Sequence, residues 1–174
     1  PVYIFLDGYC PIVLDGSTGI ELVSRGLPEP TILANLENPE EVALLAADYF
    51  SAGSDAVLTN TLTGSSIMLA KLRLSADPYS INSEAAKIAI KVKPAGKLVI
   101  GSVGPTGLLL KPFGPISEKD AISAFKPQIK ALSDSGVDAI VFETFMDLVE
   151  MGCAVNALKE VSNIPYICTM TFDA

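Results

Sequence analysis

Side chains capable of acid–base or binding chemistry follow several short apolar runs of the sequence. They are Asp15, Asn60, Thr61 and Glu143, and Gly16 accompanies Asp15. A carboxylate that directly follows a buried strand is costly to leave unpaired, so we expect Glu143 to meet a cationic partner or a ligand. The sequence contains no histidine, which excludes Ser-His-Asp and Cys-His mechanisms and histidine metal sites. Acid–base work would therefore fall to carboxylates, lysines or tyrosines.

Each of these positions also has a purely structural interpretation. Asp15 and Gly16 could form only a tight turn, because both residue types favour turns. Asn60, which stands between two threonines, could simply satisfy backbone groups at the end of a strand. The glycine- and proline-containing segment 104–107 predicts a loop that shapes the chain rather than one that contacts a ligand. For Glu143 the functional interpretation is the stronger one.

Composition excludes several classes of protein. The chain has 12 basic and 20 acidic residues, for a net charge of −8, and no basic cluster that would predict nucleic-acid binding. No apolar run approaches the roughly 18–20 residues that span a bilayer, and the first residues lack the basic leader of a secretory signal. We therefore expect a cytoplasmic protein with neither a nucleic-acid nor a membrane partner.

The cysteines indicate no metal site of their own. Cys10, Cys153 and Cys168 are an odd number at wide spacings, which fits neither a disulfide framework nor a CxxC metal clip. We expect buried free thiols.

Short β-rich runs alternate with longer stretches of helical period, as expected of repeated βα units around a parallel sheet. The repeats span roughly 30–45 residues, which suits a barrel with long loops, although a doubly wound sheet has the same periodicity. No GxGxxG or GxxxxGK[ST] motif follows a strand, which disfavours a nucleotide-binding fold. The predicted strands are residues 11–14, 56–59, 98–102, 139–142 and 166–172.

The helices between these strands have recognisable ends. Asn38 is expected to cap a helix that ends at Gly53. Ser117 and Asp120 form an acidic variant of the capping box for a helix that ends at Gly136. These ends predict amphipathic helices that cover a sheet.

Two further helix features are predicted. Asp147 and Glu150 repeat the capping arrangement before another amphipathic stretch. Pro127 lies inside the preceding helix, where it removes a backbone hydrogen bond and is expected to bend the helix.

The order of the motifs resembles that of the homocysteine S-methyltransferase family, most of all the homocysteine-binding module of cobalamin-dependent methionine synthase. The resemblance begins at about Val13 and covers the rest of the chain. Each motif alone is weak, but all lie in order and at the ends of predicted strands. The matching segments are 14–22, 52–61, 101–107, 136–144 and 169–173.

The resemblance implies a (β/α)8 barrel, of which residues 1–174 would form a single, incomplete homocysteine-binding domain with about the first five βα units. In the family, three cysteine thiolates hold a zinc ion that binds the homocysteine sulfur and lowers its pKa, and the thiolate then attacks an activated methyl group.

The resemblance also implies the substrate-binding residues. Glu143 matches the glutamate that contacts the amino group of homocysteine, and Asp15 with Gly16 matches the turn after the first strand that lines the same pocket. Asn60 and Thr61 are expected to line it. No residue of the chain is predicted to be catalytic.

The departures from the family pattern concern the metal. The zinc cysteines of the family lie after the sixth strand and near the end of the barrel, and none of the three cysteines here occupies such a position. Ile20 stands where the family commonly has threonine. Zinc is thus expected for the complete family domain but not from residues of this chain. The donor stays open among methylcobalamin, methylated amino acids and betaine-like compounds.

Three functions follow as hypotheses. The first is an enzyme of methyl transfer to homocysteine, inactive as this isolated portion. The second is a short, non-catalytic relative that binds a small amino acid or a partner protein. An unrelated reaction on a barrel is the third, by fold analogy alone. Five of eight units would leave the barrel open, so we expect self-association or completion by a missing C-terminal half.

Overall fold

The computed structural model describes residues 11–172, and a four-stranded parallel sheet organises this part of the chain. All neighbouring strands are parallel, and helices separate them along the sequence. The carboxyl ends of the strands therefore lie at one edge of the sheet. In order across the sheet, the strands are β1 (Ala56–Leu58), β2 (Leu98–Val103), β3 (Ala139–Phe145) and β4 (Tyr166–Met170).

The strand predicted at residues 11–14 is shorter than expected. Only Leu14 bridges to β1, through Ala56. The Val13 N–H donates to the Asp55 carboxylate at 3.0 Å, so it is not available to a strand carbonyl, and Pro11 has no N–H to offer. The prediction of a full strand is wrong here, but the segment still runs beside β1 and brings Asp15 to the carboxyl edge of the sheet.

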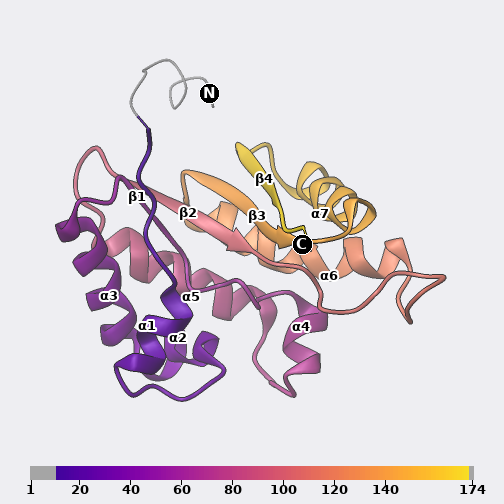
Figure 1. Ribbon diagram of the computed structural model, residues 1–174, viewed down its shortest axis with the longest axis horizontal. Coiled ribbons are helices and arrows are strands. Elements are labelled where there is room, and N and C mark those ends of the chain that lie inside the picture. Colours follow the sequence, from indigo (N-terminus) through magenta and orange to yellow (C-terminus); the bar gives the residue numbers. More distant parts are fainter. Residues whose placement is uncertain (1–10, 173–174) are drawn as a thin grey trace.

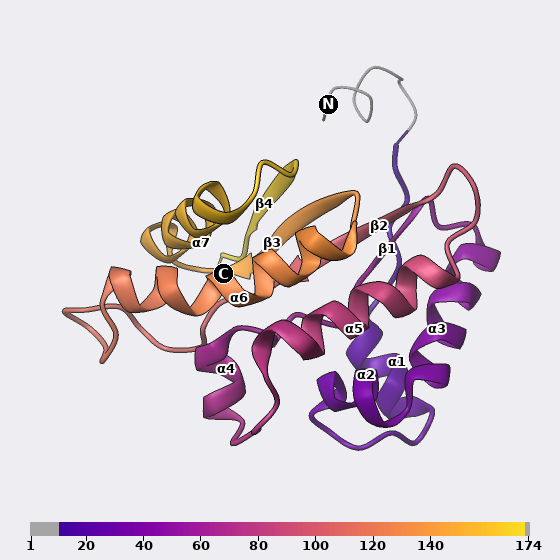
Figure 2. The ribbon, with the colours of Figure 1, turned by 180° about the vertical axis from the view of Figure 1, so that it is seen from behind.

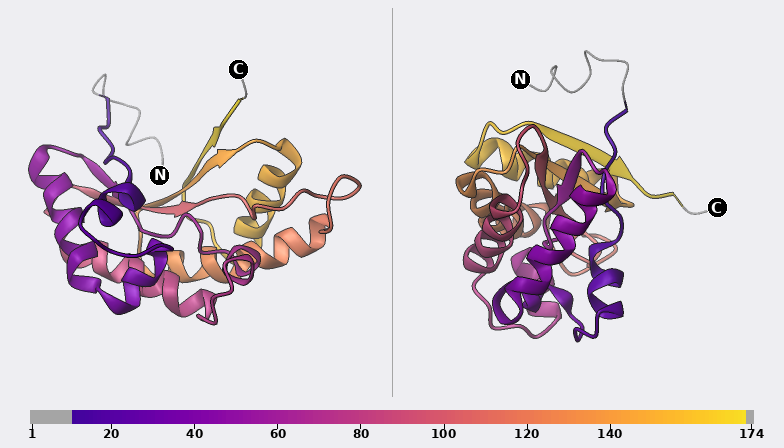
Figure 3. Two further views of the ribbon diagram at one scale, coloured as in Figure 1. Left: turned by 60° about the horizontal axis from the view of Figure 1, so that its bottom comes forward. Right: turned by 90° about the vertical axis from the view of Figure 1, so that its left-hand side faces the viewer.

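The helices cover one face of the sheet. In Figure 2, which views the molecule from behind, α5 and α6 lie in front of the strands and α7 lies beside β4, whereas in Figure 1 the strands lie in front of α5 and α6. The left view of Figure 3 places α5 and α6 on one side of the strands. The elements are α1 (Thr18–Ser24), the 3₁₀ helix η2 (Thr31–Leu33), α2 (Ala34–Glu37), α3 (Pro39–Ala52), α4 (Ser66–Lys71), α5 (Pro78–Lys91), α6 (Glu118–Ser135) and α7 (Leu148–Val161).

Both faces of the sheet carry apolar side chains, because successive residues of a strand point to opposite faces. The face toward the helices packs against Phe125 and Ile129 of α6 in the main core. The other face forms a separate cluster that includes Ile100 and Val141. A parallel sheet with two apolar faces is typical of α/β proteins, and it gives the strand ends a rigid base.

Several predicted helix ends are confirmed. Ser117 and Asp120 form a capping box at the start of α6. Gly136 and Gly53 end α6 and α3 in left-handed backbone conformations, with φ of 90° and 114°. The prediction for Asn38 is only half right, because it precedes α3 but its side chain makes no capping hydrogen bond.

The start of α7 agrees only in part with the capping arrangement predicted for Asp147 and Glu150. Asp147 caps α7 by accepting from the Val149 N–H at 2.7 Å. Glu150 does not complete a capping box there, because its buried side chain accepts hydrogen bonds from Thr106 instead. The helix α6 continues through Pro127 to its end at Ser135, and the bend expected at this proline stays a prediction.

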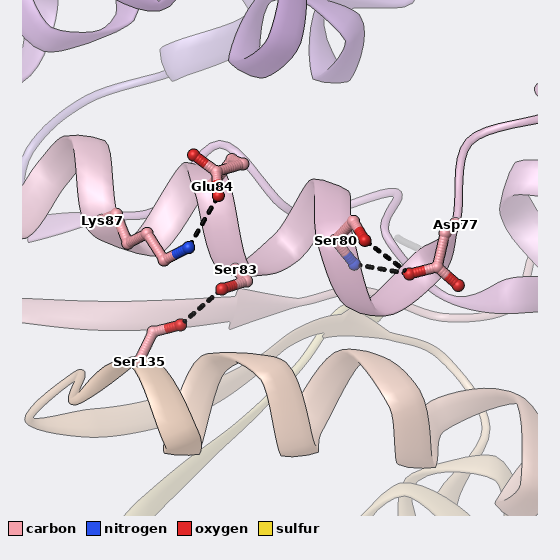
Figure 4. A network of polar contacts seen from close by, with 6 residues as sticks. All are labelled: Asp77, Ser80, Ser83, Glu84, Lys87 and Ser135. Carbon is pink, nitrogen blue, oxygen red and sulfur yellow. Dashed lines mark hydrogen bonds and ion pairs between the residues drawn. The ribbon is translucent and has the colours of Figure 1, made fainter.

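Helix α5 was not predicted, although Asp77 followed by Pro78 is a common start of a helix. The Asp77 carboxylate accepts hydrogen bonds from the N–H and hydroxyl of Ser80, each at 2.8 Å. The hydroxyls of Ser83 and Ser135 lie 3.0 Å apart and link α5 to the end of α6 (Figure 4). This contact helps to fix the helix layer beneath β2.

Acidic residues at the amino ends of two strands are paired with lysines. Asp55 bonds to Lys97 at 2.8 Å and Asp138 to Lys93 at 2.9 Å. Asp138 also accepts from the Val99 N–H at 2.8 Å. Both carboxylates therefore join neighbouring segments of the sheet, at the edge opposite the predicted site.

Part of β4, the last strand of the sheet, is exposed. Tyr166 and Ile167 of β4 are exposed, so self-association or completion of the sheet stays our prediction.

Cys153 is buried as expected, but Cys168 on β4 is exposed, which corrects the prediction of a buried thiol; Cys10 lies outside the described residues. Among residues 11–172, no helix is both long and apolar enough to cross a bilayer.

The capping box of α6 provides a test of the fold. Replacing Ser117 by alanine removes the acceptor for the Asp120 N–H and should lower the free energy of unfolding by about 1 kcal/mol. Ser51→Ala is the matched control, because its hydroxyl bonds only back to Ala47 within α3 and its loss should be nearly neutral. Urea denaturation would measure both, and equal effects would contradict the assignment.

Candidate functional site

A cavity of about 460 Å³ opens beside the carboxyl ends of β1, β2 and β3. All five residues predicted to bind a substrate line it, so the structure gathers them at one place; their binding role stays a prediction. No lysine or arginine is among the described residues that line it. The lining residues are Leu14, Asp15, Gly16, Ser17, Thr18, Gly19, Thr31, Leu58, Thr59, Asn60, Thr61, Leu62, Thr63, Ser102, Glu143 and Thr144.

Asp15 is only partly satisfied by the protein. Its Oδ2 accepts from the Leu58 N–H at 2.9 Å, whereas its Oδ1 is buried without a hydrogen-bond partner in the described part of the chain. Burial, with a smaller contribution from the negative charge of Glu143, raises the pKa of Asp15 to about 6 against the lowering effect of backbone hydrogen bonds. Asp15 is therefore a carboxylate that a cation would stabilise.

Glu143 lies near the end of β3, where the strand is irregular. The pairing of β3 with β4 shifts between Phe142 and Phe145, and Thr144 has a φ of 62°, a left-handed conformation that costs energy for a β-branched residue. Such irregularities re-aim side chains. Glu143 itself continues the alternation that places Ala139 and Val141 on the face away from the helices, and it lines the cavity. The side chain that leaves the alternation is Phe145, which joins the main core.

The polar contact of Glu143 is a hydroxyl rather than a cation. Ser102 of β2 donates its hydroxyl to Oε1 of Glu143 at 2.5 Å. Among residues 11–172 neither Glu143 nor Asp15 forms an ion pair. The cationic partner predicted for Glu143 is thus not found among residues 11–172.

The side chain of Asn60 is engaged within the protein. Its Nδ2 donates to the Thr31 carbonyl at 2.7 Å and to Oδ1 of Asn35 at 3.2 Å. Asn35 in turn donates to the Asn60 carbonyl at 2.8 Å. These bonds favour the structural interpretation of the Asn60 amide, which ties η2 and α2 to the end of β1 and so forms one wall of the cavity.

Thr61 is also engaged within the protein, and its side chain is fully buried. Its hydroxyl donates to the Ser102 carbonyl at 2.7 Å and lies 2.5 Å from the hydroxyl of Thr59. The buried amide of Gln128, from α6, donates to the Thr61 carbonyl at 2.6 Å and to the Ser102 carbonyl at 3.3 Å. These bonds hold the ends of β1 and β2 together.

Sequence reasoning missed Ser102 and Gln128 as residues of the site. A signal for Ser102 existed, because it is the polar last residue of the predicted strand 98–102, much as Glu143 directly follows the predicted strand 139–142. Gln128 gave no signal, since a glutamine beside a proline on an amphipathic helix is ordinarily exposed.

Gly16 has a steric role. A Cβ atom on this residue would lie 2.9 Å from the hydroxyl oxygen of Tyr49, closer than real Cβ atoms approach. Burial is the main cause that raises the pKa of Tyr49, which keeps this phenol neutral. A side chain at this position would thus require the end of the Tyr49 side chain to shift where the chain turns from Asp15 into α1.

The segment 104–107 supports the site from outside. Glu150 of α7 accepts hydrogen bonds from the N–H and hydroxyl of Thr106, at 2.8 and 2.5 Å. The Gly104 N–H donates to the Leu62 carbonyl at 3.0 Å. None of the described residues that line the cavity belongs to this segment, in keeping with a loop that shapes the chain.

No group of three or more cysteine, aspartate or glutamate side chains that could hold a metal ion is found within residues 11–172. Cys153 is buried in α7 and Cys168 lies on β4. The described residues therefore do not fit the three-thiolate zinc site that the family resemblance implies.

Comparison with known sequences identifies one family. The model of the family described as homocysteine S-methyltransferase matches residues 12–174. The homocysteine S-methyltransferase YbgG of Bacillus subtilis (strain 168) is 29% identical over 185 residues, which cover 92% of this chain and 58% of that protein. The homocysteine S-methyltransferase of Escherichia coli (strain K12) is 28% identical, with 92% and 57% covered. The chain thus spans a little over half the length of these relatives.

A longer relative matches at the same level of identity over a smaller share of this chain. The methionine synthase of Mycobacterium tuberculosis (strain ATCC 25618 / H37Rv) is 29% identical over 158 residues, which cover 83% of this chain and 13% of that protein. Because the short and long relatives have the same level of identity, these matches do not favour the predicted methionine synthase branch over the other.

Solved structures support the fold. The metallated form of the homocysteine methyltransferase MmuM from Escherichia coli matches with a TM-score of 0.82 at 24% identity, over 98% of this chain and 66% of that one. The apo form matches with a TM-score of 0.77 at 22% identity, over 98% and 62%. The parallel strands and their helices thus correspond to part of a (β/α)8 barrel, as predicted.

The raised pKa of Asp15 leads to a prediction about stability. An acid whose pKa is higher in the folded than in the unfolded state stabilises the fold most below its unfolded pKa, and this contribution is lost as the pH rises through the folded pKa. For Asp15 the pKa is 3.8 for an unperturbed aspartate, as in the unfolded chain, and about 6 in the folded protein. Asp15→Asn keeps an acceptor for the Leu58 N–H and removes the buried charge, so it should stabilise the protein at neutral pH.

We expect a gain of about 1–2 kcal/mol at about pH 7.5, after allowance for partial exposure, and a smaller gain at about pH 5. Urea denaturation at the two pH values would measure it. Glu37→Gln, at an exposed position on α2, controls for the change in net charge. A gain for Asp15→Asn that does not depend on pH would contradict the assigned burial of the charge.

Proposed function

Because the chain belongs to the homocysteine S-methyltransferase family, we propose that it binds homocysteine in the cavity, as the substrate-holding part of a protein that transfers a methyl group to the homocysteine sulfur. One observation carries the proposal: Asp15 and Glu143 face the same cavity, and Oδ1 of Asp15 has no partner among the described residues.

Electrostatics support an ammonium group as the ligand between these carboxylates. Burial and the charge of Glu143 both disfavour ionised Asp15, and a cation bound beside the two would offset both effects. An ammonium has three donors and no acceptor, so it suits two carboxylates whose free oxygens lack donors. The α-amino group of an amino acid meets this requirement.

The remainder of the cavity suits the rest of homocysteine. Leu14, Leu58 and Leu62 offer apolar surface for the methylene groups. Neutral donors from Ser17 and Thr18, at the start of α1, are available for the carboxylate of the ligand. Small-molecule sites commonly combine apolar walls with a few polar groups that fix orientation, and here the carboxylates provide the orientation.

The contribution of the described residues to the reaction is to hold and orient the substrate. In the proposed transfer, the sulfur forms a bond to the methyl carbon, the bond between that carbon and its donor breaks, and the thiol proton is lost. Fixing the amino end of homocysteine limits the positions that its sulfur can take, which lowers the entropic cost of the reaction. The described residues do not fit a zinc site, so the role proposed for them is confined to holding the substrate.

Removal of the Glu143 charge tests the proposal. Glu143→Gln keeps the size of the side chain and an acceptor for Ser102 but removes half of the negative charge that faces the ammonium. We expect the affinity for homocysteine to fall about tenfold or more. Isothermal titration calorimetry or an NMR shift titration of the chain would measure the dissociation constants.

Glu40→Gln serves as the control, because Glu40 is exposed on α3 and its neutralisation should leave binding unchanged. Equal affinities of wild type and Glu143→Gln would remove the basis of the proposal. The alternative, an amino-acid-binding relative without catalysis, predicts the same loss of binding and differs only in showing no methyl transfer in any protein that includes this domain.

A further inference from the structure

The contacts of Glu143 lead beyond the predicted ligand-binding residues to the neighbouring strand. Ser102 is nearly the last residue of β2 and is 2% exposed. Its hydroxyl meets Oε1 of Glu143 at 2.5 Å, and both residues line the cavity. We infer that Ser102 is the positioning residue for Glu143 and sets the affinity for an amino-acid ammonium through it. This inference rests on the proposed function.

The direction of each hydrogen bond around Ser102 follows from counting donors. The Thr61 hydroxyl has one hydrogen and donates it to the Ser102 carbonyl at 2.7 Å. The Thr59 hydroxyl, 2.5 Å from that of Thr61, must therefore be the donor of that pair. It accepts in turn from the Ser102 N–H at 3.0 Å. Thr59, Thr61 and Ser102 thus form a closed ring of hydrogen bonds.

This ring uses the backbone groups of Ser102 and leaves its hydroxyl to bond to Glu143. The N–H and carbonyl of Ser102 are both engaged with threonines of the β1 end, and Gln128 adds a second donor to the Ser102 carbonyl at 3.3 Å. The backbone that carries the hydroxyl is thereby fixed. Because an ionised carboxylate can only accept, the Ser102 hydroxyl is the donor to Glu143.

A fixed hydroxyl has a direct effect on the carboxylate. Hydrogen bonds to charged groups are stronger than those between neutral groups, and this one engages one oxygen of Glu143 while the other can face a ligand. A glutamate side chain otherwise has several freely rotating bonds, and ordering them on binding costs entropy. Ser102 orders them in advance, so its loss should weaken ligands that depend on Glu143.

Removal of the hydroxyl tests this inference with two probes. L-homocysteine carries the ammonium, whereas 4-sulfanylbutanoate is the same molecule without it. We expect Ser102→Ala to weaken L-homocysteine binding about tenfold and to leave 4-sulfanylbutanoate unchanged. Titration calorimetry or NMR shift titration of the whole chain would measure both. Ser83→Ala likewise removes the hydroxyl of a buried serine, but this hydroxyl bonds to Ser135 at the α5–α6 interface, so the change should affect neither ligand.

A double-mutant cycle separates positioning from general support of the fold. If Ser102 acts through Glu143, then Ser102→Ala should have little further effect on homocysteine binding once Glu143 is glutamine. Should Ser102→Ala fold poorly, Ser102→Cys retains a weaker donor of similar size and should give an intermediate loss of homocysteine affinity.

Two results would overturn the inference. An equal loss for both ligands, or losses that simply add in the cycle, would mean that Ser102 supports the fold without acting on Glu143. If the wild-type chain binds 4-sulfanylbutanoate as well as homocysteine, the proposed function itself fails, because the ammonium is then not recognised, and the inference fails with it.

Discussion

The negative charges of Asp15 and Glu143, which face one cavity without a cation among the described residues, are the constraint on which the site depends. Burial and mutual repulsion make such charges costly. The protein offsets part of this cost with neutral donors, the Leu58 N–H for Asp15 and the Ser102 hydroxyl for Glu143. A cationic ligand would offset the remainder, which is the basis for proposing an ammonium as the ligand of the cavity.

Acidic residues have different partners at the two edges of the sheet. At the amino edge, Asp55 and Asp138 bind lysines and neighbouring backbone N–H groups. At the carboxyl edge, neither Asp15 nor Glu143 forms an ion pair with a lysine or arginine among residues 11–172. This division is typical of (β/α)8 barrels, where one end of the strands serves stability and the other serves function. It also explains why motif residues of similar appearance in the sequence have unlike roles.

The arrangement of strands and the gathering of the five predicted residues could be read from the sequence, because parallel strands bring their carboxyl ends to one edge whatever the details of packing. The orientations and contacts of individual side chains could not be predicted from the sequence. Glu150 shows this clearly: its position suggests a helix cap, yet it bonds to Thr106 of a distant loop. Likewise, nothing in the pattern around Gln128 indicates that α6 places its amide against the ends of β1 and β2.

The pKa of the Asp15 carboxyl group, followed by carbon-13 NMR with and without homocysteine, tests the central claim most directly. The account predicts a value of about 6 in the free chain and a clear decrease when homocysteine is bound, because a nearby ammonium favours the ionised acid. The analogue 4-sulfanylbutanoate should produce no decrease. An Asp15 pKa that stays the same or rises in the presence of saturating homocysteine would contradict an ammonium site between the two carboxylates.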